Sequence, residues 1–174
     1  MRLYAPDELP GLFTIARNRL FHLETRDEYL SSSENAAMRR FLDDETTDPS
    51  GEWFAPWSTL VASTTSRGIA MERARVITTP PGAYTRYLLA LTPHNIAAGE
   101  DVRWLPRTDA DPSDAASPDY WLVDDRVVAY SVFDANDWWS GVATTDDPVI
   151  VKYACDIRDR VWDKAIPHNQ YRWQ

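Results

Sequence analysis

Cysteine and glycine are both scarce in this sequence, and each shortage limits what the protein can be. Cys155 is the only cysteine among 174 residues, so no disulfide can form within the chain. That composition suits a reducing compartment. Only six glycines are present, which argues against a glycine-rich phosphate loop or a repeat solenoid. We therefore expect a globular protein without a cofactor.

Long apolar segments are also missing. No run approaches the length of a membrane span, and the N-terminal residues 1–8 lack the apolar region of a signal peptide. We expect a cytoplasmic protein that does not meet a membrane. The apolar fraction of 44%, with eight Trp and eight Tyr, is typical of a globular domain. The length fits one domain, so we predict a single domain over residues 1–174.

Positive charge is depleted in one stretch of the chain. Residues 100–147 carry 12 acids and 3 bases, while the net charge of the whole chain is −9. A nucleic-acid binder needs a basic face that displaces counterions from phosphates, so we expect no direct nucleic-acid binding. Two interpretations of the acidic stretch stay open: a solvated surface that maintains solubility, or a face that docks on a basic protein.

Familiar catalytic and metal-binding motifs are absent. The chain has no Gly-x-Ser-x-Gly elbow and no His-x-x-x-His or Cys-x-x-Cys pair. Cys155 falls on the apolar side of a helical pattern, which favours a buried filler over a reactive thiol. Asp124, Asp125 and Asp134 could meet around a hard cation, but acidic turn residues are far commoner. We expect neither a catalytic residue nor a metal.

Residues 1–57 have mainly helical patterns. The expected elements are a short helix over 7–17 interrupted at Pro10-Gly11, a strand or extended link over 19–25, a helix opened by the capping-box spacing of Ser31 and Glu34, and a loop over 43–57.

A core of strands and helices is expected over residues 58–166, followed by a tail over 167–174. The predicted elements are strands at 58–65 and 69–77, a helix from 79 with Tyr84, Tyr87, Leu88 and Leu91 on one face, a strand at 101–106, a mobile loop at 107–118, strands at 120–123, 127–133 and 139–143, and a helix begun by Asp147-Pro148. This order predicts an α/β or α+β fold, with a mixed sheet and flanking helices.

Arginines alternate along the predicted strand 69–77. Arg73 and Arg75 share one face by the two-residue period, and Arg103 and Arg107 belong to the next strand. If the strands are neighbours, these guanidinium groups could converge on a carboxylate or phosphate, which Arg recognises with its forked donors. In the alternative interpretation they pair with neighbouring acids, including Glu72 and Asp101.

Four tryptophans lie in or beside predicted loops: Trp53, Trp57, Trp138 and Trp139. Exposed aromatic side chains mark binding surfaces, but such residues also cover the edge of a core. Contact with a partner or ligand and simple packing are both open at these positions.

Several segments resemble a known family: residues 21–29, 103–107, 119–125, 146–151 and 158–162. Together they resemble an uncharacterised actinobacterial family whose members tend to be encoded beside helix-turn-helix regulators. The resemblance extends from about residue 20 to 171. It implies a regulatory setting and assigns no activity.

The order of elements from residue 69 onward also resembles one half of the phospholipase D-like fold, here preceded by N-terminal helices. Active members of that fold carry His-x-Lys followed by Asp, and the matching positions here hold Asp119, Trp121 and Arg126. The reaction needs the histidine as nucleophile, so the departures put phosphodiesterase activity in doubt. The resemblance implies kinship with non-catalytic, effector-sensing relatives.

Our leading hypothesis is a non-enzymatic regulatory protein that binds a helix-turn-helix regulator through its acidic or aromatic surface. It would also sense a small anionic ligand, with the site formed by Arg73, Arg75, Arg103, Arg107, Asp119, Trp121 and Asp124. The alternative hypothesis is an enzyme that acts on a phosphate ester or nucleotide through the arginines and Asp119 or Asp124.

Overall fold

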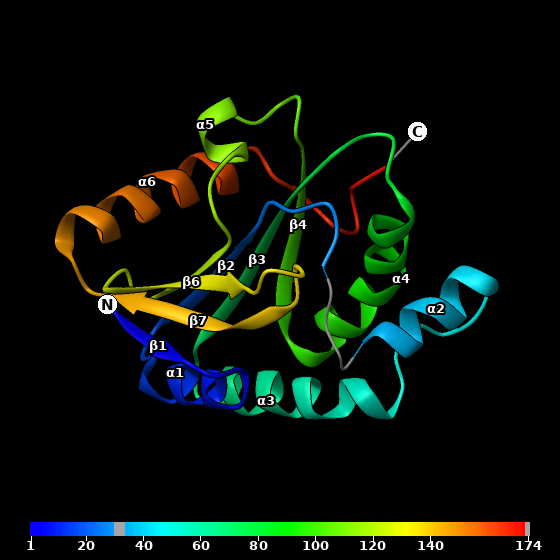
Figure 1. The fold of residues 1–174 in the computed structure, drawn as a ribbon, viewed down its shortest axis with the longest axis horizontal. Coiled ribbons are helices and arrows are strands. Elements are labelled where there is room, and N and C mark those ends of the chain that lie inside the picture. The colour runs from blue at the N-terminus through cyan, green and yellow to red at the C-terminus, as the bar shows by residue number, and fades with distance from the viewer. Residues whose placement is uncertain (30–33, 173–174) are drawn as a thin grey trace.

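An eight-stranded mixed sheet forms the centre of the protein (Figure 1). The structure is a computed structural model, and it describes residues 1–29 and 34–172. The strands are β1 (Arg2–Tyr4), β2 (Arg19–Glu24), β3 (Ala70–Ile77), β4 (Glu100–Pro106), β5 (Tyr120–Val123), β6 (Val127–Phe133), β7 (Trp139–Thr145) and β8 (Ile166–Pro167).

The strands are arranged in the order β1-β7-β6-β5-β2-β3-β4-β8. The central strands β2, β3 and β4 are parallel, and the other pairings are antiparallel. Helical crossovers make the parallel pairings possible, because a short hairpin cannot join parallel strands. The mixed sheet with flanking helices that the sequence predicts is therefore confirmed.

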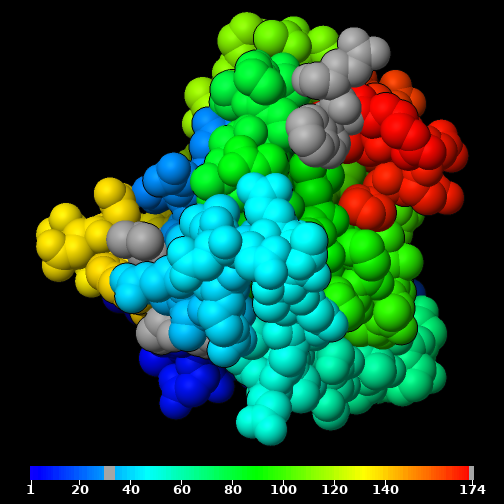
Figure 2. Space-filling model, turned by 90° about the vertical axis from the view of Figure 1, so that its right-hand side faces the viewer, coloured from blue at the N-terminus to red at the C-terminus, as the bar shows by residue number. Residues whose placement is uncertain are grey.

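Helices cover both faces of the sheet. They are α1 (Leu9–Ile15), α2 (Asn35–Asp43), α3 (Ala55–Thr65), α4 (Ala83–Ala98), α5 (Pro112–Ala115) and α6 (Pro148–Lys164), with short 3₁₀ turns at Pro6–Glu8 and Glu52–Phe54. Figure 1 shows α6 on one side of the sheet and α1 and α3 on the other. Figure 2 shows α2, in cyan, lying against the green surface of α4.

Side chains alternate between the two faces along β2. Phe21 and Leu23 join the core beneath α6, whereas Leu20 joins the core beneath α1 and α3. The two-residue period of a strand then places His22 and Glu24 on the same face as Leu20. Two polar side chains therefore enter the interior on the face that α3 and α4 cover.

The segment 58–65 is helical, so the predicted strand there is wrong. Its β-branched residues belong to α3, which has Pro56 in its first turn, a position that suits proline. Serine and threonine hydroxyls bond back to carbonyls of the same helix, as in Thr64 Oγ1 to Leu60 O at 2.8 Å. Val61 and Thr64 are buried. Tertiary burial of this face outweighs the weak strand preference of the residues.

Smaller differences occur elsewhere. Helix α4 begins at Ala83, after the two prolines, and runs through Pro93 to Ala98. The loop expected over 107–118 contains α5, whose cap Asp111 accepts a hydrogen bond from Ser113 N at 2.8 Å. The capping residue Ser31 lies outside the described residues, and α2 follows Glu34 without a side-chain cap.

Both ends of the chain pack on the sheet. β1, which the sequence analysis missed, pairs with β7 in antiparallel fashion. At the other edge β8 pairs with β4, and the buried ring of Tyr171 stacks on Trp104 with centroids 5.9 Å apart. The tail therefore folds back on the body of the protein at Tyr171.

Candidate functional site

Five ionisable side chains form a layer between the sheet and the helices α3 and α4. We call His22, Glu24, Arg73, Arg75 and Glu100 the charged layer. They come from β2, β3 and the first residue of β4. The most exposed member, Glu24, has a side chain that is only 12% exposed. Charges are rarely buried to this extent unless they are paired.

Each charge in the layer has a partner. Arg73 Nε lies 2.8 Å from Glu100 Oε2, and Arg73 Nη1 contacts both Glu24 Oε1 and, at 2.9 Å, His22 Nδ1. Arg75 Nε donates to Glu24 Oε2 at 2.5 Å. The two arginines are therefore held by two carboxylates, so their charges are neutralised inside the protein.

Indole rings surround the guanidinium groups. The Arg73 guanidinium lies 5.5 Å from the ring centroid of Trp57 and 5.6 Å from that of Trp121. The imidazole of His22 stacks on Trp121 at 4.1 Å, and Arg75 lies over Trp104 at 5.2 Å. Cation–π contacts strengthen when water is excluded, which adds to the ion pairing of the layer.

Burial and charge together fix the protonation states. Burial, with the positive charge of Arg73, lowers the pKa of His22 to about 3, so its imidazole is neutral near neutral pH. Burial alone would raise the pKa of Glu24, but the charges of Arg75 and Arg73 outweigh it and keep that pKa well below its usual range. The layer thus contains charged Arg–Glu pairs beside a neutral histidine.

A second group of side chains lies beyond the charged layer, where β2 and β3 end. We call Tyr29, Glu34, Tyr84, Tyr87 and Asp119 the acidic edge. Tyr84 OH donates to Glu34 Oε1 at 2.6 Å, and Tyr29 OH donates to Asp119 Oδ2. The tyrosine rings of these two pairs lie 5.7 Å apart. Burial raises the pKa of both carboxyl groups above their usual values.

The predicted convergence of four arginines is only partly formed. Arg73 and Arg75 share a face of β3, and β3 and β4 are neighbours. Arg103, however, is paired in register with Ala74, which faces the α6 core. It therefore lies on the opposite face, where its guanidinium stacks 3.8 Å from the centroid of Trp162. Arg107 lies at the end of β4 and donates to backbone carbonyls, including Ala115 O at 2.8 Å.

Only one of the two acids named as partners for these arginines pairs with one of them. Asp101 binds Arg103 at 3.1 Å, whereas Glu72 binds Arg19 at 2.5 Å. The partners of Arg73 and Arg75 come instead from β2 and from the start of β4. Strand pairing brings these partners together from distant positions in the sequence, and local spacing does not reveal them.

The remaining expected ligand residues have structural contacts. Asp124 accepts hydrogen bonds from three successive backbone N–H groups at the start of β2 and just before it, including Arg17 N at 2.7 Å. Asp119 accepts from Thr25 N at 2.7 Å. Trp121 packs between His22 and the α1 core. Asp119 thus belongs to the acidic edge, and Trp121 borders the charged layer. Asp124 lies apart from both.

The four loop tryptophans are all partly buried. Trp57 donates from Nε1 to Glu100 Oε1 at 2.6 Å, so it belongs to the charged layer's surroundings. Trp139 packs against the α1 and α3 core, and Trp53 against the core beneath α4. Trp138 lies in the hairpin between β6 and β7 and is also partly covered. A role for any of them in partner binding remains a prediction.

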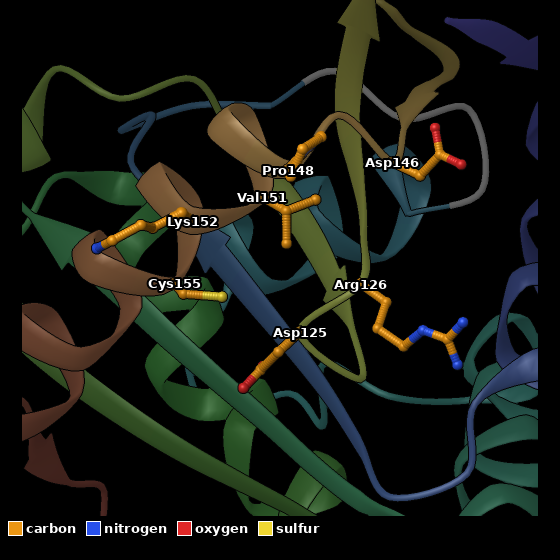
Figure 3. Close-up of a pocket in the computed structure, with 7 residues that line it drawn as sticks. All are labelled: Asp125, Arg126, Asp146, Pro148, Val151, Lys152 and Cys155. Carbon is orange, nitrogen blue, oxygen red and sulfur yellow. The ribbon is translucent and has the colours of Figure 1, made fainter.

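A surface hollow of about 540 Å³ lies between the β5–β6 turn and the first turns of α6 (Figure 3). The thiol of Cys155 lines it, while Arg126 and Lys152 extend in opposite directions. Burial raises the pKa of Cys155, so the thiol stays protonated and unreactive near neutral pH. Within residues 1–29 and 34–172, no three His, Cys, Asp or Glu side chains are placed to hold a metal ion.

Sequence reasoning missed His22, Glu24, Glu34 and Glu100 as site residues. A signal was available for two of them, because His22 and Glu24 alternate with Phe21 and Leu23 in a strand that is otherwise apolar. A central parallel strand is buried on both faces, so polar residues at alternate positions indicate a buried polar site. That argument requires knowing that β2 is central.

The sequence matches the family described as Domain of unknown function (DUF6879) over residues 7–173. The chain belongs to this family, and the expected membership of an uncharacterised family is confirmed at that level. No curated protein matches the sequence significantly. Among the described residues, no helix combines the length and apolar character needed to cross a membrane.

One solved structure with a similar fold is that of TrmBL2, an archaeal chromatin protein with a novel mode of DNA binding. It shares 11% sequence identity with this chain at a TM-score of 0.51, over 95% of this chain and 55% of the other. This chain thus spans about half the length of that protein. The likeness contradicts one of our expectations about partners. From charge alone we expected no direct nucleic-acid binding. That exclusion is wrong, because the same fold occurs in a DNA-binding protein.

Proposed function

We propose that this chain is a non-enzymatic regulatory domain that binds a small polar ligand where the charged layer meets the acidic edge. The observation that carries the proposal is the position of these side chains. The acidic edge lies beyond the ends of the parallel strands β2 and β3, next to Glu24, the last residue of β2, and open α/β sheets commonly bind ligands beyond the carboxyl ends of their strands. Ionisable groups with shifted pKa values also gather at functional sites.

Two features favour binding over catalysis. The Nδ1 atom of His22 contacts Arg73, and the low pKa of His22 makes it a weak base. Glu24 and Glu100 are held by arginines. The groups that could move a proton or attack a substrate are therefore already engaged by other protein groups.

The test is a thermal-shift screen of the purified chain against small polar metabolites of both charges. A ligand that binds the folded state raises the melting temperature in proportion to RT ln(1 + [L]/Kd). We expect a subset of related compounds to do so, and to lose their effect in the variant Asp119→Asn. The matched control Asp101→Asn changes a half-exposed acid on the other face of the sheet. Absence of any stabilising compound would reject the ligand-binding role.

A second candidate function is association with DNA, which the fold similarity to TrmBL2 favours. The measurement is fluorescence anisotropy of a labelled duplex titrated with the chain at low and at higher salt. Binding through phosphates must weaken as salt rises, because counterions are released. A duplex that remains unbound at low salt would remove this candidate.

We also propose that the segment from β3 to α6 is a phospholipase D-like half-domain without its catalytic motif. The support is its order of strand, helix, strand, a connection that contains the short helix α5, three strands and a helix. The competing enzyme hypothesis predicts hydrolysis of a phosphodiester such as bis(p-nitrophenyl) phosphate. We expect no turnover above buffer, and turnover that disappears in Asp119→Asn would establish the enzyme instead.

A further inference from the structure

We propose that Glu34, Asp119 and Tyr87 mark a binding site for a small organic amine at the acidic edge. This inference rests on the proposed function, because it names the chemical class of the ligand. The amine would lie near the rings of Tyr29 and Tyr84, between α4 and the ends of β2 and β3. Three independent features of the structure lead to this assignment: charge, an unpaired hydroxyl and the aromatic surroundings.

The first feature is a surplus of negative charge. Arg73 and Arg75 are held by Glu24 and Glu100, and the neighbouring Arg26 and Arg107 pair with Asp137 and Asp27. Neither Glu34 nor Asp119 has a cationic partner among the described residues, since each accepts hydrogen bonds from uncharged groups such as Tyr84 and Thr25. The undescribed residues 30–33 are Leu-Ser-Ser-Ser and carry no charge. Two carboxyl groups are therefore left without a cation.

Their titration agrees with this geometry. Burial raises the pKa of Glu34 and of Asp119, and the nearby negative charge of Glu24 raises both further. A bound cation would lower both pKa values, because an opposite charge favours the ionised form. Binding of an amine should therefore release protons from the site at mildly acidic pH.

The second feature is the hydroxyl of Tyr87. This side chain is fully buried, and its oxygen has no hydrogen-bond partner among the described residues. Burial, together with the negative charge of Glu34, raises the pKa of this hydroxyl. The buried Oδ1 of Asn35, adjacent to Glu34, likewise finds no partner within the described part of the chain. An unpaired buried polar atom is destabilising, and a ligand with an N–H donor would provide the partner that the hydroxyl of Tyr87 lacks.

The third feature is the aromatic surroundings. The Tyr29 ring lies 5.7 Å from that of Tyr84, and the rings of Tyr84 and Tyr87 are 6.0 Å apart. Aromatic faces combined with carboxylates are the surroundings that recognise organic ammonium groups. A phosphate or carboxylate ligand would instead meet uncompensated negative charge here.

The experiment is isothermal titration calorimetry of the full chain with diaminobutane, butanediol and succinate as probes. These probes share a four-carbon backbone and differ in charge. We expect diaminobutane to bind, with proton release detected as a dependence of the heat on the buffer's ionisation enthalpy. We expect butanediol to bind at least roughly tenfold more weakly, because its hydrogen bonds lack a charge. Succinate should not bind.

Variants then locate the site. Glu34→Gln keeps the shape but removes the charge, and should weaken diaminobutane binding roughly tenfold or more. Tyr87→Phe removes only the unpaired hydroxyl, so it tests the site even if Glu34→Gln fails to fold, and should weaken binding roughly threefold. Glu45→Gln, at an exposed acid paired with Arg86, should bind like the unchanged chain. Undiminished binding by Tyr87→Phe would mean that Tyr87 holds no ligand and would overturn the site.

The outcomes separate this inference from the proposed function. Binding of succinate in place of diaminobutane, or a hit in the metabolite screen that Glu34→Gln leaves unchanged, overturns the amine site and keeps the ligand-binding role. Failure of all three probes together with failure of the whole screen overturns both.

Discussion

At the level of single residues, His22 shows most clearly how buried surroundings change the protonation of an ionisable side chain. A histidine side chain on a central strand is stacked on Trp121 and contacted by an arginine that cannot lose its charge. The fold therefore keeps the imidazole of His22 neutral. Protonation would place a second positive charge against Arg73 in a site from which water is largely excluded.

This arrangement predicts a specific pH dependence of stability. The pKa of His22 is about 3 in the folded chain against about 6.5 in the unfolded chain. The stabilisation is therefore complete above about pH 6.5 and is lost as the pH falls toward about 3, by up to about 1.4 kcal/mol per pH unit. The variant His22→Gln should lose this part of the pH dependence, as measured by urea unfolding at a series of pH values.

The control for this prediction is His94→Gln, which changes a histidine at the surface next to Asp48. His168 contributes in the same direction as His22, because burial and Arg75 lower its pKa. Glu34 and Asp119 contribute with opposite sign, since burial raises their pKa values. The comparison with His22→Gln isolates the His22 contribution. Identical pH profiles for the variant and the unchanged chain would contradict it.

Residue patterns predicted the arginine pair better than its partners. The two-residue period placed Arg73 and Arg75 on one face of β3, and that is where both lie. The register between β3 and β4 places Arg103 on the opposite face of the sheet. Register depends on tertiary packing, which residue spacing alone does not encode. Glu24 reaches the arginines only because β2 pairs with β3, although the two strands lie far apart in the sequence.

At the level of elements, α3 is the segment for which local propensity misleads. Threonine and valine favour strands, yet residues 55–65 form a helix whose buried face packs on the sheet. Elements with a strong period or a clear cap, such as α6 with Asp147 accepting from Val149 N at 2.9 Å, were predictable. In such elements the residue pattern, the cap and the packing all favour a helix. In α3 the residue types favour a strand, whereas the packing favours a helix.

A substitution series at Ala62, an exposed position within α3, tests the helical assignment. In a helix, Ala62→Gly should lower the free energy of unfolding by about 1 kcal/mol and Ala62→Pro by about 3 kcal/mol or more. Ala62→Val should also destabilise slightly, because β-branching restricts the side chain in a helix. Chemical denaturation followed by circular dichroism gives all three values. A stabilising effect of Ala62→Val would instead indicate the strand that the composition suggests.

At the level of the whole molecule, the two chain ends complete the two edges of the sheet. β1 pairs along β7, and β8 pairs along β4. Unpaired strand edges invite association with other chains, so these short terminal strands limit exposure of the longer ones. Neither was predicted from the sequence, because a strand of two or three residues has too few positions to show a period.

Gly141 of β7 lies directly against β1, and a substitution there tests the pairing of the two strands. Its φ of +133° is unfavourable for other residues, and a Cβ atom there would lie 2.1 Å from the carbonyl oxygen of Tyr4. We therefore expect Gly141→Ala to displace β1 and to lower the free energy of unfolding by about 2 kcal/mol. Hydrogen exchange should show loss of protection at the amides of residues 2–4.

The matched control is Gly11→Ala, at a helical glycine in α1 where an added Cβ atom would approach no neighbouring group within 4 Å. Because alanine favours the helix, this change should raise stability by up to about 1 kcal/mol and leave β1 protected. The two glycines thus give opposite signs for the same chemical substitution. Retained protection of β1 in Gly141→Ala would mean that the close approach of Tyr4 to Gly141 does not govern the pairing of β1 with β7.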